Sequence, residues 1–281
     1  MTEDARAAPG GRLGRCGAAA LAGAVAALGH APFDLWPITP LGLAALLLIA
    51  GRRTGVRDWA WLFWAAGTGY FAVSLHWIVE PFFVDAATHG WMAPFALALM
   101  AGGMALFWAL AGGLAARVAP PGPLRMPFAL VLLVLAEAAR AQVFTGFPWA
   151  HPGHVLIASD LLALAAWTGP HGLTAVTLAV AGGLAWFAAR RSWIGAAALS
   201  IGFAMAGVLP GTPAAPVASA DAPVVRLIQP NAPQDQKWLP EMIPVFFQRG
   251  LTLTAAASEG PAPDLVIWPE TSLPVLLDRS E

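Results

Sequence analysis

The segment with the clearest capacity for chemistry lies near the end of the sequence, between Asp264 and Glu270. Leu265 to Trp268 is a short apolar run of β-forming residues, which is typical of a buried strand. Pro269 cannot donate a hydrogen bond to a sheet, so it ends the strand and places Glu270 just beyond it. The C-terminal edge of the strands in an α/β layer often carries functional groups. A partly desolvated carboxylate at that edge can act as a general base. The alternative is a loop glutamate that only faces water.

A second candidate is the pair Glu137 and Arg140, which lie three residues apart within an apolar run. Residues at this spacing touch on one face of a helix. Ionisable groups inside a membrane are functional candidates, but a self-neutralising pair that fixes the register of the helix also explains them.

Cysteine and histidine chemistry receives less support. The single cysteine, Cys16, excludes an internal disulfide and a cysteine-based zinc cluster, and no neighbouring His or Lys activates its thiol. We interpret it as a small apolar core residue. The six histidines show no metal-ligand spacing, and we interpret His151 and His154 as part of a wet interfacial loop. The cysteine and histidine positions therefore predict no metal site.

The composition is that of a membrane protein. Hydrophobic residues make up 58% of the chain and charged residues 11%, against roughly 25% charged in soluble domains. The net charge of -1 gives no reason to expect nucleic-acid binding.

Apolar runs predict a polytopic helical domain of about seven spans over residues 1–209. The predicted spans are 16–28, 38–50, 59–79, 91–116, 126–143, 170–188 and 193–209. The first two are short for a hydrocarbon core that needs about 20 residues, and they form a hairpin or a re-entrant pair. A basic region before the first run also fits a cleaved signal peptide, but we favour a retained span because more spans follow. Trp59, Trp91 and Trp193 are expected in aromatic belts.

Arginine placement predicts the orientation. Every second connection contains arginine: Arg6, Arg12 and Arg15; then Arg52, Arg53 and Arg57; then Arg117 and Arg125; then Arg190 and Arg191. The connections near 30–37, 80–90 and 145–160 contain no Lys or Arg. Positive residues stay in the cytoplasm, so the N-terminus is expected inside and the C-terminal part outside.

Residues 210–223 are rich in Pro, Ala and Gly and are predicted to form a linker. Residues 224–281 then change character. Strand candidates at 224–229 and 265–268 flank a helix candidate at 244–258, which is the opening of an α/β layer. Two strands and one helix bury too little surface to stand alone, so we expect the chain to stop inside a domain.

Several short segments, taken in this order along the chain, carry a resemblance to a known family: 32–37, Glu137 with Arg140, 145–149, 229–231, 237–238 and 268–270. Together with the preceding spans they resemble the apolipoprotein N-acyltransferases, inner-membrane enzymes that add the third acyl chain to bacterial lipoproteins. The resemblance implies a multi-pass protein of the bacterial inner membrane that carries a periplasmic nitrilase-type (carbon-nitrogen hydrolase) domain, truncated here.

The resemblance also implies residue roles. Glu270 corresponds to the general base of the family. Trp238 matches an aromatic residue over the active site, and Trp149 would line the rim of a lipid access path, although simple interfacial anchoring explains Trp149 as well. The family's oxyanion lysine and nucleophilic cysteine have no counterpart here, because the only lysine, Lys237, precedes Glu270. We therefore expect this fragment alone to be inactive.

The reaction implied by the resemblance is a two-step acyl transfer from a phospholipid, through a thioester, to the N-terminal amine of a diacylglyceryl lipoprotein. It needs no metal and no soluble cofactor. Two alternatives stay open. One is a membrane-tethered nitrilase-like amidase, which would not need so many spans. The other is a polytopic transporter with a periplasmic tail, for which we find no internal repeat.

Overall fold

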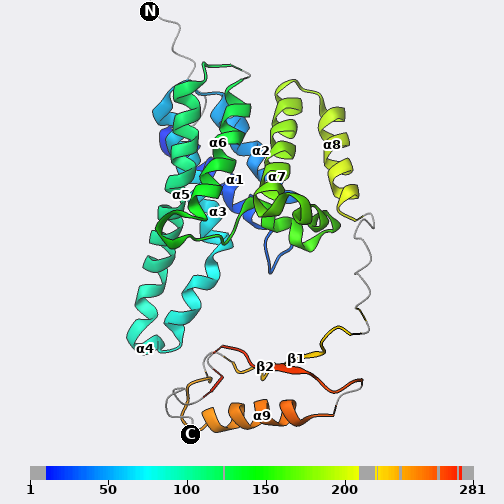
Figure 1. Cartoon of the computed structure of the whole chain (residues 1–281). Coiled ribbons are helices and arrows are strands. Elements are labelled where there is room, and N and C mark those ends of the chain that lie inside the picture. The colour runs from blue at the N-terminus through cyan, green and yellow to red at the C-terminus, as the bar shows by residue number, and fades with distance from the viewer. Residues whose placement is uncertain are drawn as a thin grey trace, which may run out of the picture. The chain divides into compact units, whose positions relative to one another are not determined.

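The computed structural model describes residues 11–122, 124–208, 219, 221–233, 236–257, 260–270 and 272–273. The chain divides into two compact units, Met1–Glu80 with Trp91–Pro213, and Pro81–Gly90 with Ala214–Glu281. We describe each unit by itself (Figure 1). The predicted linker 210–223 lies outside the described residues except for 219 and 221–223.

Apolar helices build the first unit, and each lies where an apolar run predicts one. In the described part of this unit the longer helices are α1 (Arg12–Ala27), α2 (Ile38–Gly51), α3 (Val56–Ser74), α5 (Ala93–Val118), α6 (Arg125–Arg140), α7 (Ala165–Ala189) and α8 (Trp193–Ala206). Short 3₁₀ helices lie in the connections, at His76–Phe83, Gly90–Met92, Val143–Thr145, Pro152–Ala158 and Asp160–Leu164. Helix α4 (Ala86–His89) falls in Pro81–Gly90, which is grouped with the second unit.

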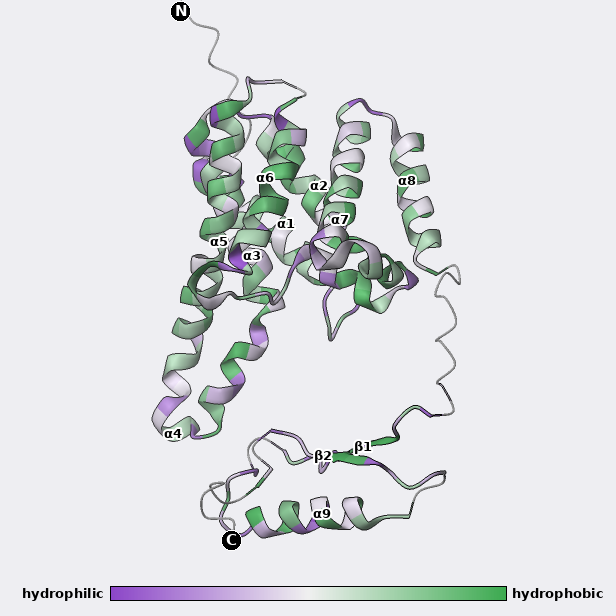
Figure 2. Ribbon diagram, viewed as in Figure 1, coloured by the Kyte–Doolittle hydropathy of each residue, from purple (hydrophilic) through white to green (hydrophobic). Residues whose placement is uncertain are grey.

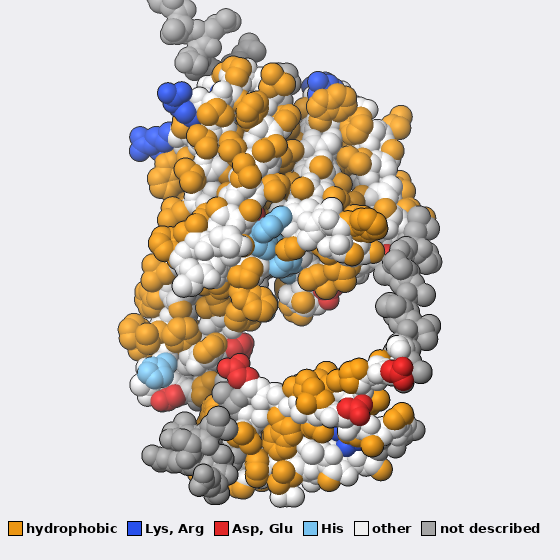
Figure 3. Space-filling model, in the orientation of Figure 1, with side chains coloured by type: hydrophobic (Ala, Val, Ile, Leu, Met, Phe, Trp, Pro, Cys, Tyr) orange, Lys and Arg blue, Asp and Glu red, His pale blue; other side chains and the backbone are white. Residues whose placement is uncertain are grey.

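Two helical stretches of the described chain, Ala86–Val118 and Asp160–Ala189, are long and apolar enough to cross a membrane. A third candidate, Val56–Ser74 with His76–Phe83, is bent by 49° at the break. Helices α2 and α8 are apolar but only 14 residues long, about 21 Å at 1.5 Å per residue. Many apolar side chains of this unit are exposed, among them Leu99 and Leu110 of α5. Figure 2 shows that hydrophobic residues predominate along its helices, and Figure 3 shows many hydrophobic side chains on the face in view. These are properties of a membrane protein.

Helix α3 is central to the unit and packs against α1 and α5. Small residues bring α1 and α3 together: a Cβ on Gly23 would collide with the backbone of Ala66, and one on Gly69 with the backbone of Ala20. Such small-residue contacts are common between membrane helices.

The break near the start of α7 has an identifiable cause. Gly169 has φ +64°, a conformation open to glycine, and Pro170 follows in the first turn of the long part of the helix. The helical stretch after this break begins at Pro170, the residue at which the sequence predicts the sixth span to start.

The predicted aromatic belt is wrong for one of its three residues. Trp59 is buried, so it does not lie in an outer belt, whereas Trp91 and Trp193 are exposed and their place in a belt stays a prediction. Its indole Nε1 donates to the Arg53 carbonyl, and its ring lies under the Arg125 guanidinium, 5.5 Å from the ring centroid. These partners hold Trp59 inside the bundle.

The second unit contains a strand–helix–strand arrangement. Strands β1 (Val225–Leu227) and β2 (Leu265–Ile267) pair in parallel, and α9 (Ile243–Ala255) connects them. The Asp264 carboxylate accepts from the Val224 N–H at 2.8 Å at the start of the pair.

The prediction that the second strand is buried is wrong, since Leu265 and Ile267 are exposed. The side chain of Arg226 in β1 reaches the last carbonyls of α9, so α9 covers one face of the strand pair. Alternate residues point to the other face, which α9 does not cover.

Candidate functional site

The two parallel strands end at the same edge, and their continuations carry the polar residues of interest. Gln229-Pro230-Asn231 follows β1, and Trp268-Pro269-Glu270 follows β2. The Ile228 N–H donates to the Ile267 carbonyl at 2.9 Å, which keeps the two strand ends together. The carboxyl edge of a parallel sheet is a common position for functional groups.

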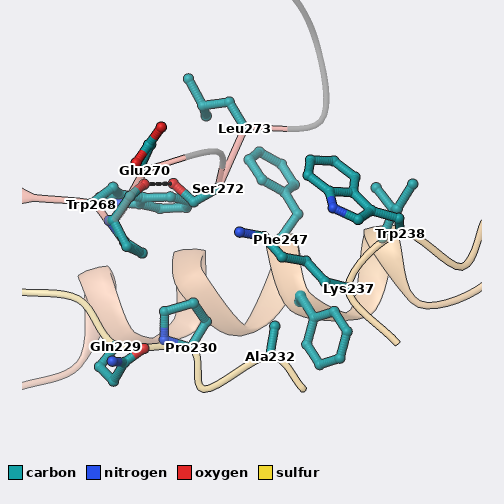
Figure 4. Close-up of a pocket in the computed structure, with 13 residues that line it drawn as sticks. Gln229, Pro230, Ala232, Lys237, Trp238, Phe247, Trp268, Glu270, Ser272 and Leu273 are labelled. Carbon is teal, nitrogen blue, oxygen red and sulfur yellow. Dashed lines mark hydrogen bonds between the residues drawn. The ribbon is translucent and has the colours of Figure 1, made fainter. Parts of the chain in front are cut away.

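A cavity of about 140 Å³ opens at this edge, and Glu270, Lys237 and Trp238 all line it. Glu270 and Trp238 lie at opposite ends of the cavity, and the Lys237 side chain extends between them (Figure 4). Glu270 is exposed, and the Lys237 amine lies 5.4 Å from the centre of the Trp238 ring. The structure therefore brings a carboxylate, an ammonium group and an indole into one pocket.

Helix α9 holds the strand side of this pocket in place through Trp268. A Cβ at Gly250 would meet the Trp268 ring at 2.7 Å, so the indole lies directly on the helix at this position. The Trp268 Nε1 donates to Thr254 Oγ1 at 3.0 Å, and the Phe247 ring lies 5.8 Å away. These contacts fix the residue that stands two positions before Glu270.

The helical unit contains a buried ionic cluster formed by Trp108, Glu137, Arg140 and His151. Arg140 Nη2 contacts Glu137 Oε2 at 2.5 Å, which confirms the predicted contact between the two side chains. The same carboxylate accepts from Trp108 Nε1 and from His151 Nδ1, both at 2.8 Å. We place the His151 proton on Nδ1 because a carboxylate oxygen only accepts. These hydrogen bonds and the ion pair offset the free energy that it costs to remove the Glu137 carboxylate from water.

Arg140 also holds the segment that contains Trp149. Its Nη1 donates to the Phe147 carbonyl at 2.6 Å and to the Trp149 carbonyl at 2.9 Å. The Phe147 N–H returns a hydrogen bond to the Arg140 carbonyl at 3.0 Å. Gly146 makes the tight return possible, with φ +85° and no room for a Cβ beside Ala141 O. The arginine thus fixes the backbone around an exposed tryptophan.

The interpretation of His151 as part of a wet loop is wrong, because this side chain is fully buried. Burial lowers the pKa of the neighbouring His154 to about 4, so His154 is neutral at pH 7 and adds no charge to the cluster. His151 and Trp108 lie 14 and 29 positions from Glu137, so no local spacing marks them as its partners. The one available signal is that a buried carboxylate requires several donors.

The predicted site residues are not all brought together. Glu270 and Trp238 share the pocket of the second unit, whereas Trp149 belongs to the first unit, where its ring lies 5.8 Å from that of Trp77. Cys16 lies in α1 and packs against the helical core. In the described residues no group of three or more His, Cys, Asp or Glu side chains is arranged to hold a metal ion.

Together these features define a largely helical protein with membrane-capable helices and a short α/β segment that carries a carboxylate at its sheet edge. Residues 22–183 match the family described as the apolipoprotein N-acyltransferase N-terminal domain. The chain belongs to this family.

Curated relatives extend the similarity over most of the chain. The apolipoprotein N-acyltransferase of Caulobacter vibrioides is 38% identical over 92% of this chain and 50% of its own length. That of Rhodopseudomonas palustris is 34% identical over 93% of this chain and 52% of its own length, and that of Brucella suis is 31% identical over 94% and 53%. The chain spans about half the length of the curated relatives it matches.

Proposed function

We propose that this chain forms the membrane domain and the general-base segment of an apolipoprotein N-acyltransferase. The reaction transfers an acyl chain from a phospholipid to the α-amino group of the N-terminal cysteine of a diacylglyceryl lipoprotein. One observation carries the proposal: in a chain of this family, Glu270 directly follows β2 and lines a pocket with Lys237 and Trp238. Residues 224–281 then form the first part of a nitrilase-type domain.

Glu270 acts as the base in the first step. It accepts the proton of a cysteine thiol, and the thiolate attacks the carbonyl carbon of the phospholipid ester. A carbon–sulfur bond forms, the ester carbon–oxygen bond breaks, and the lysophospholipid leaves with the proton. The lipoprotein amine then attacks the thioester and releases the thiol. Cys16 does not take the nucleophile's role, because it packs in α1 against the helical core.

The two tryptophans contact the lipid substrates in this proposal. Trp238 is exposed at the mouth of the pocket and offers an apolar surface to an acyl chain. Trp149 is exposed on the backbone that Arg140 holds and lines the access path from the bilayer. Amphipathic indole rings are favoured at membrane interfaces.

Lipid-anchored substrates require a membrane location, which we propose to be the bacterial inner membrane. The seven longer helices of the described part of the first unit form the spans, the N-terminus is cytoplasmic, and the C-terminal unit is periplasmic. Arginine side chains gather at one end of the helical unit (Figure 3), in agreement with the positive-inside rule.

The topology makes a direct prediction. Alkaline phosphatase fused after Ala222 is expected to be active, because this enzyme requires the periplasm, whereas a fluorescent protein at the same position is expected to stay dark. A phosphatase fusion within the arginine-bearing connection after Arg191 serves as the inactive control. A fluorescent fusion at Ala222 together with an inactive phosphatase would reverse the proposed orientation.

The reaction itself is tested with the complete protein in detergent micelles. We expect a diacylated lipopeptide to gain one acyl chain when phospholipid is supplied, measured by mass spectrometry. A lipopeptide with an acetylated N-terminal amine is the matched control and should gain none. Hydrolysis of a soluble amide without acyl transfer would instead favour the tethered amidase.

A further inference from the structure

The helical unit contains a larger cavity that the proposed reaction does not use. Its volume is about 690 Å³, within the range of roughly 300–1,000 Å³ typical of small-molecule sites. The cavity lies by the start of α6 and the end of α7, next to the arginine-bearing connections. Trp149 follows the opposite end of α6, so the cavity is separate from the proposed lipid access path.

The inner wall of this cavity is apolar. Met126 and Leu130 of α6 face Ala179, Gly182 and Trp186 of α7 across it. Leu130 packs closely against Gly182, and Ala179 is an exposed small residue. The cavity is therefore an apolar trough between α6 and α7 of a membrane protein, which suits a hydrocarbon chain.

Three arginines, Arg53, Arg125 and Arg190, line the same cavity, and no Asp or Glu is among its described lining residues. Arg190 is exposed, with its guanidinium 3.9 Å from the centre of the Trp186 ring. Arg53 contacts Asp58, outside the lining, at 3.2 Å and keeps a third of its side chain exposed. The positive charge of the mouth favours an anion.

Arg125 contributes charge from inside the wall. It is buried, and its guanidinium donates to the carbonyls of Thr54, Ala116 and Ala119 at 2.9 to 3.3 Å. Ala116 and Ala119 are at the C-terminal end of α5, where free carbonyls carry partial negative charge. No carboxylate is among these partners, and the partial charge of the carbonyls offsets only part of the guanidinium charge. Arg125 therefore leaves a net positive charge beside the cavity.

We propose that this cavity binds an anionic phospholipid from the leaflet on the arginine side, with the phosphate near Arg53 and Arg190 and an acyl chain between α6 and α7. A soluble anion of similar charge would leave the apolar wall without a complementary contact. A neutral lipid would make no ionic contact with the arginines. The proposal depends on the membrane location of the helices but not on acyl transfer at Glu270.

The test uses the complete protein in nanodiscs of phosphatidylcholine, with phosphatidylglycerol added in steps and lipid retention measured by native mass spectrometry. We expect Arg190→Gln to weaken phosphatidylglycerol retention about tenfold, the effect expected for one charge-assisted contact. Arg117→Gln is the matched control: Arg117 lies at the same end, is exposed and does not line the cavity. It should leave retention unchanged.

A second pair of variants tests the apolar wall. Ala179→Phe fills the trough and should abolish retention of phosphatidylglycerol, whereas Ala175→Phe, one turn earlier on an exposed position outside the cavity, should not. Equal effects of Arg190→Gln and Arg117→Gln would overturn the proposal. Equal retention of phosphatidylcholine, or displacement of the lipid by inorganic phosphate alone, would overturn it as well. Acyl transfer measured in parallel separates a failure of this site from a failure of the proposed function.

Discussion

Glu270→Gln in the complete protein is expected to reduce lipoprotein N-acylation by at least about 10²-fold, because a positioned general base contributes about 10²–10⁴ in rate. The amide keeps the size of the side chain and its hydrogen-bonding capacity but cannot accept the thiol proton. Glu270 is exposed at the rim of its pocket, so the substitution should leave the protein level unchanged. The measurement is thioester formation on the nucleophilic cysteine together with protein abundance in the membrane.

Glu241→Gln is the matched control for this prediction. Glu241 is an exposed carboxylate of the same unit, just before α9, and it does not line the pocket. The Glu241→Gln variant of the complete protein should therefore show normal lipoprotein N-acylation. Normal thioester formation by well-folded Glu270→Gln protein would remove Glu270 from the catalytic residues and with it the proposed mechanism.

Local signals in the sequence predicted the elements well. Apolar runs marked the helices, Pro170 marked the start of the long part of α7, and Pro269 marked the end of β2. The position of Glu270 just after β2 followed directly, because a proline limits where a strand ends regardless of tertiary contacts. The approach of Lys237 and Trp238 to Glu270 required the parallel pairing of β1 and β2, which no local signal specifies.

The errors came from long-range packing. Trp59 lies at the end of a predicted span, where tryptophan is usually a membrane-interface residue. The guanidinium of Arg125, which is distant in sequence, nevertheless covers its ring. His151 lies in a polar connection, yet it enters the bundle because the Glu137 carboxylate needs donors. Hydropathy measures the average preference of a residue type for water or an apolar environment. It does not include the requirement that a buried charge be surrounded by hydrogen-bonding partners, which must then be buried as well.

The second large effect is expected at this buried cluster. Glu137→Leu should lower the free energy of unfolding by about 3–5 kcal/mol, the usual cost of removing one partner from a buried ion pair. The substitution leaves the Arg140 guanidinium uncompensated in an apolar surrounding, and it removes the acceptor for Trp108 and His151. Glu80→Leu is the control: Glu80 is exposed, and its substitution should change stability by no more than about 0.5 kcal/mol.

Unfolding of the complete protein in mixed micelles, followed by tryptophan fluorescence, measures both variants. The double variant Glu137→Leu with Arg140→Leu tests the physical reason, because it removes both charges from the interior. If charge compensation is the cause, the double variant loses less stability than the sum of the two single losses. Strictly additive losses would show that Glu137 and Arg140 act only through packing.

A second readout is proteolysis of the chain between Ala141 and His151. Arg140 donates to the Phe147 and Trp149 carbonyls, and Glu137 holds the Arg140 side chain in the position to do so. Either single variant should therefore release these carbonyls and make this segment more susceptible to proteolysis.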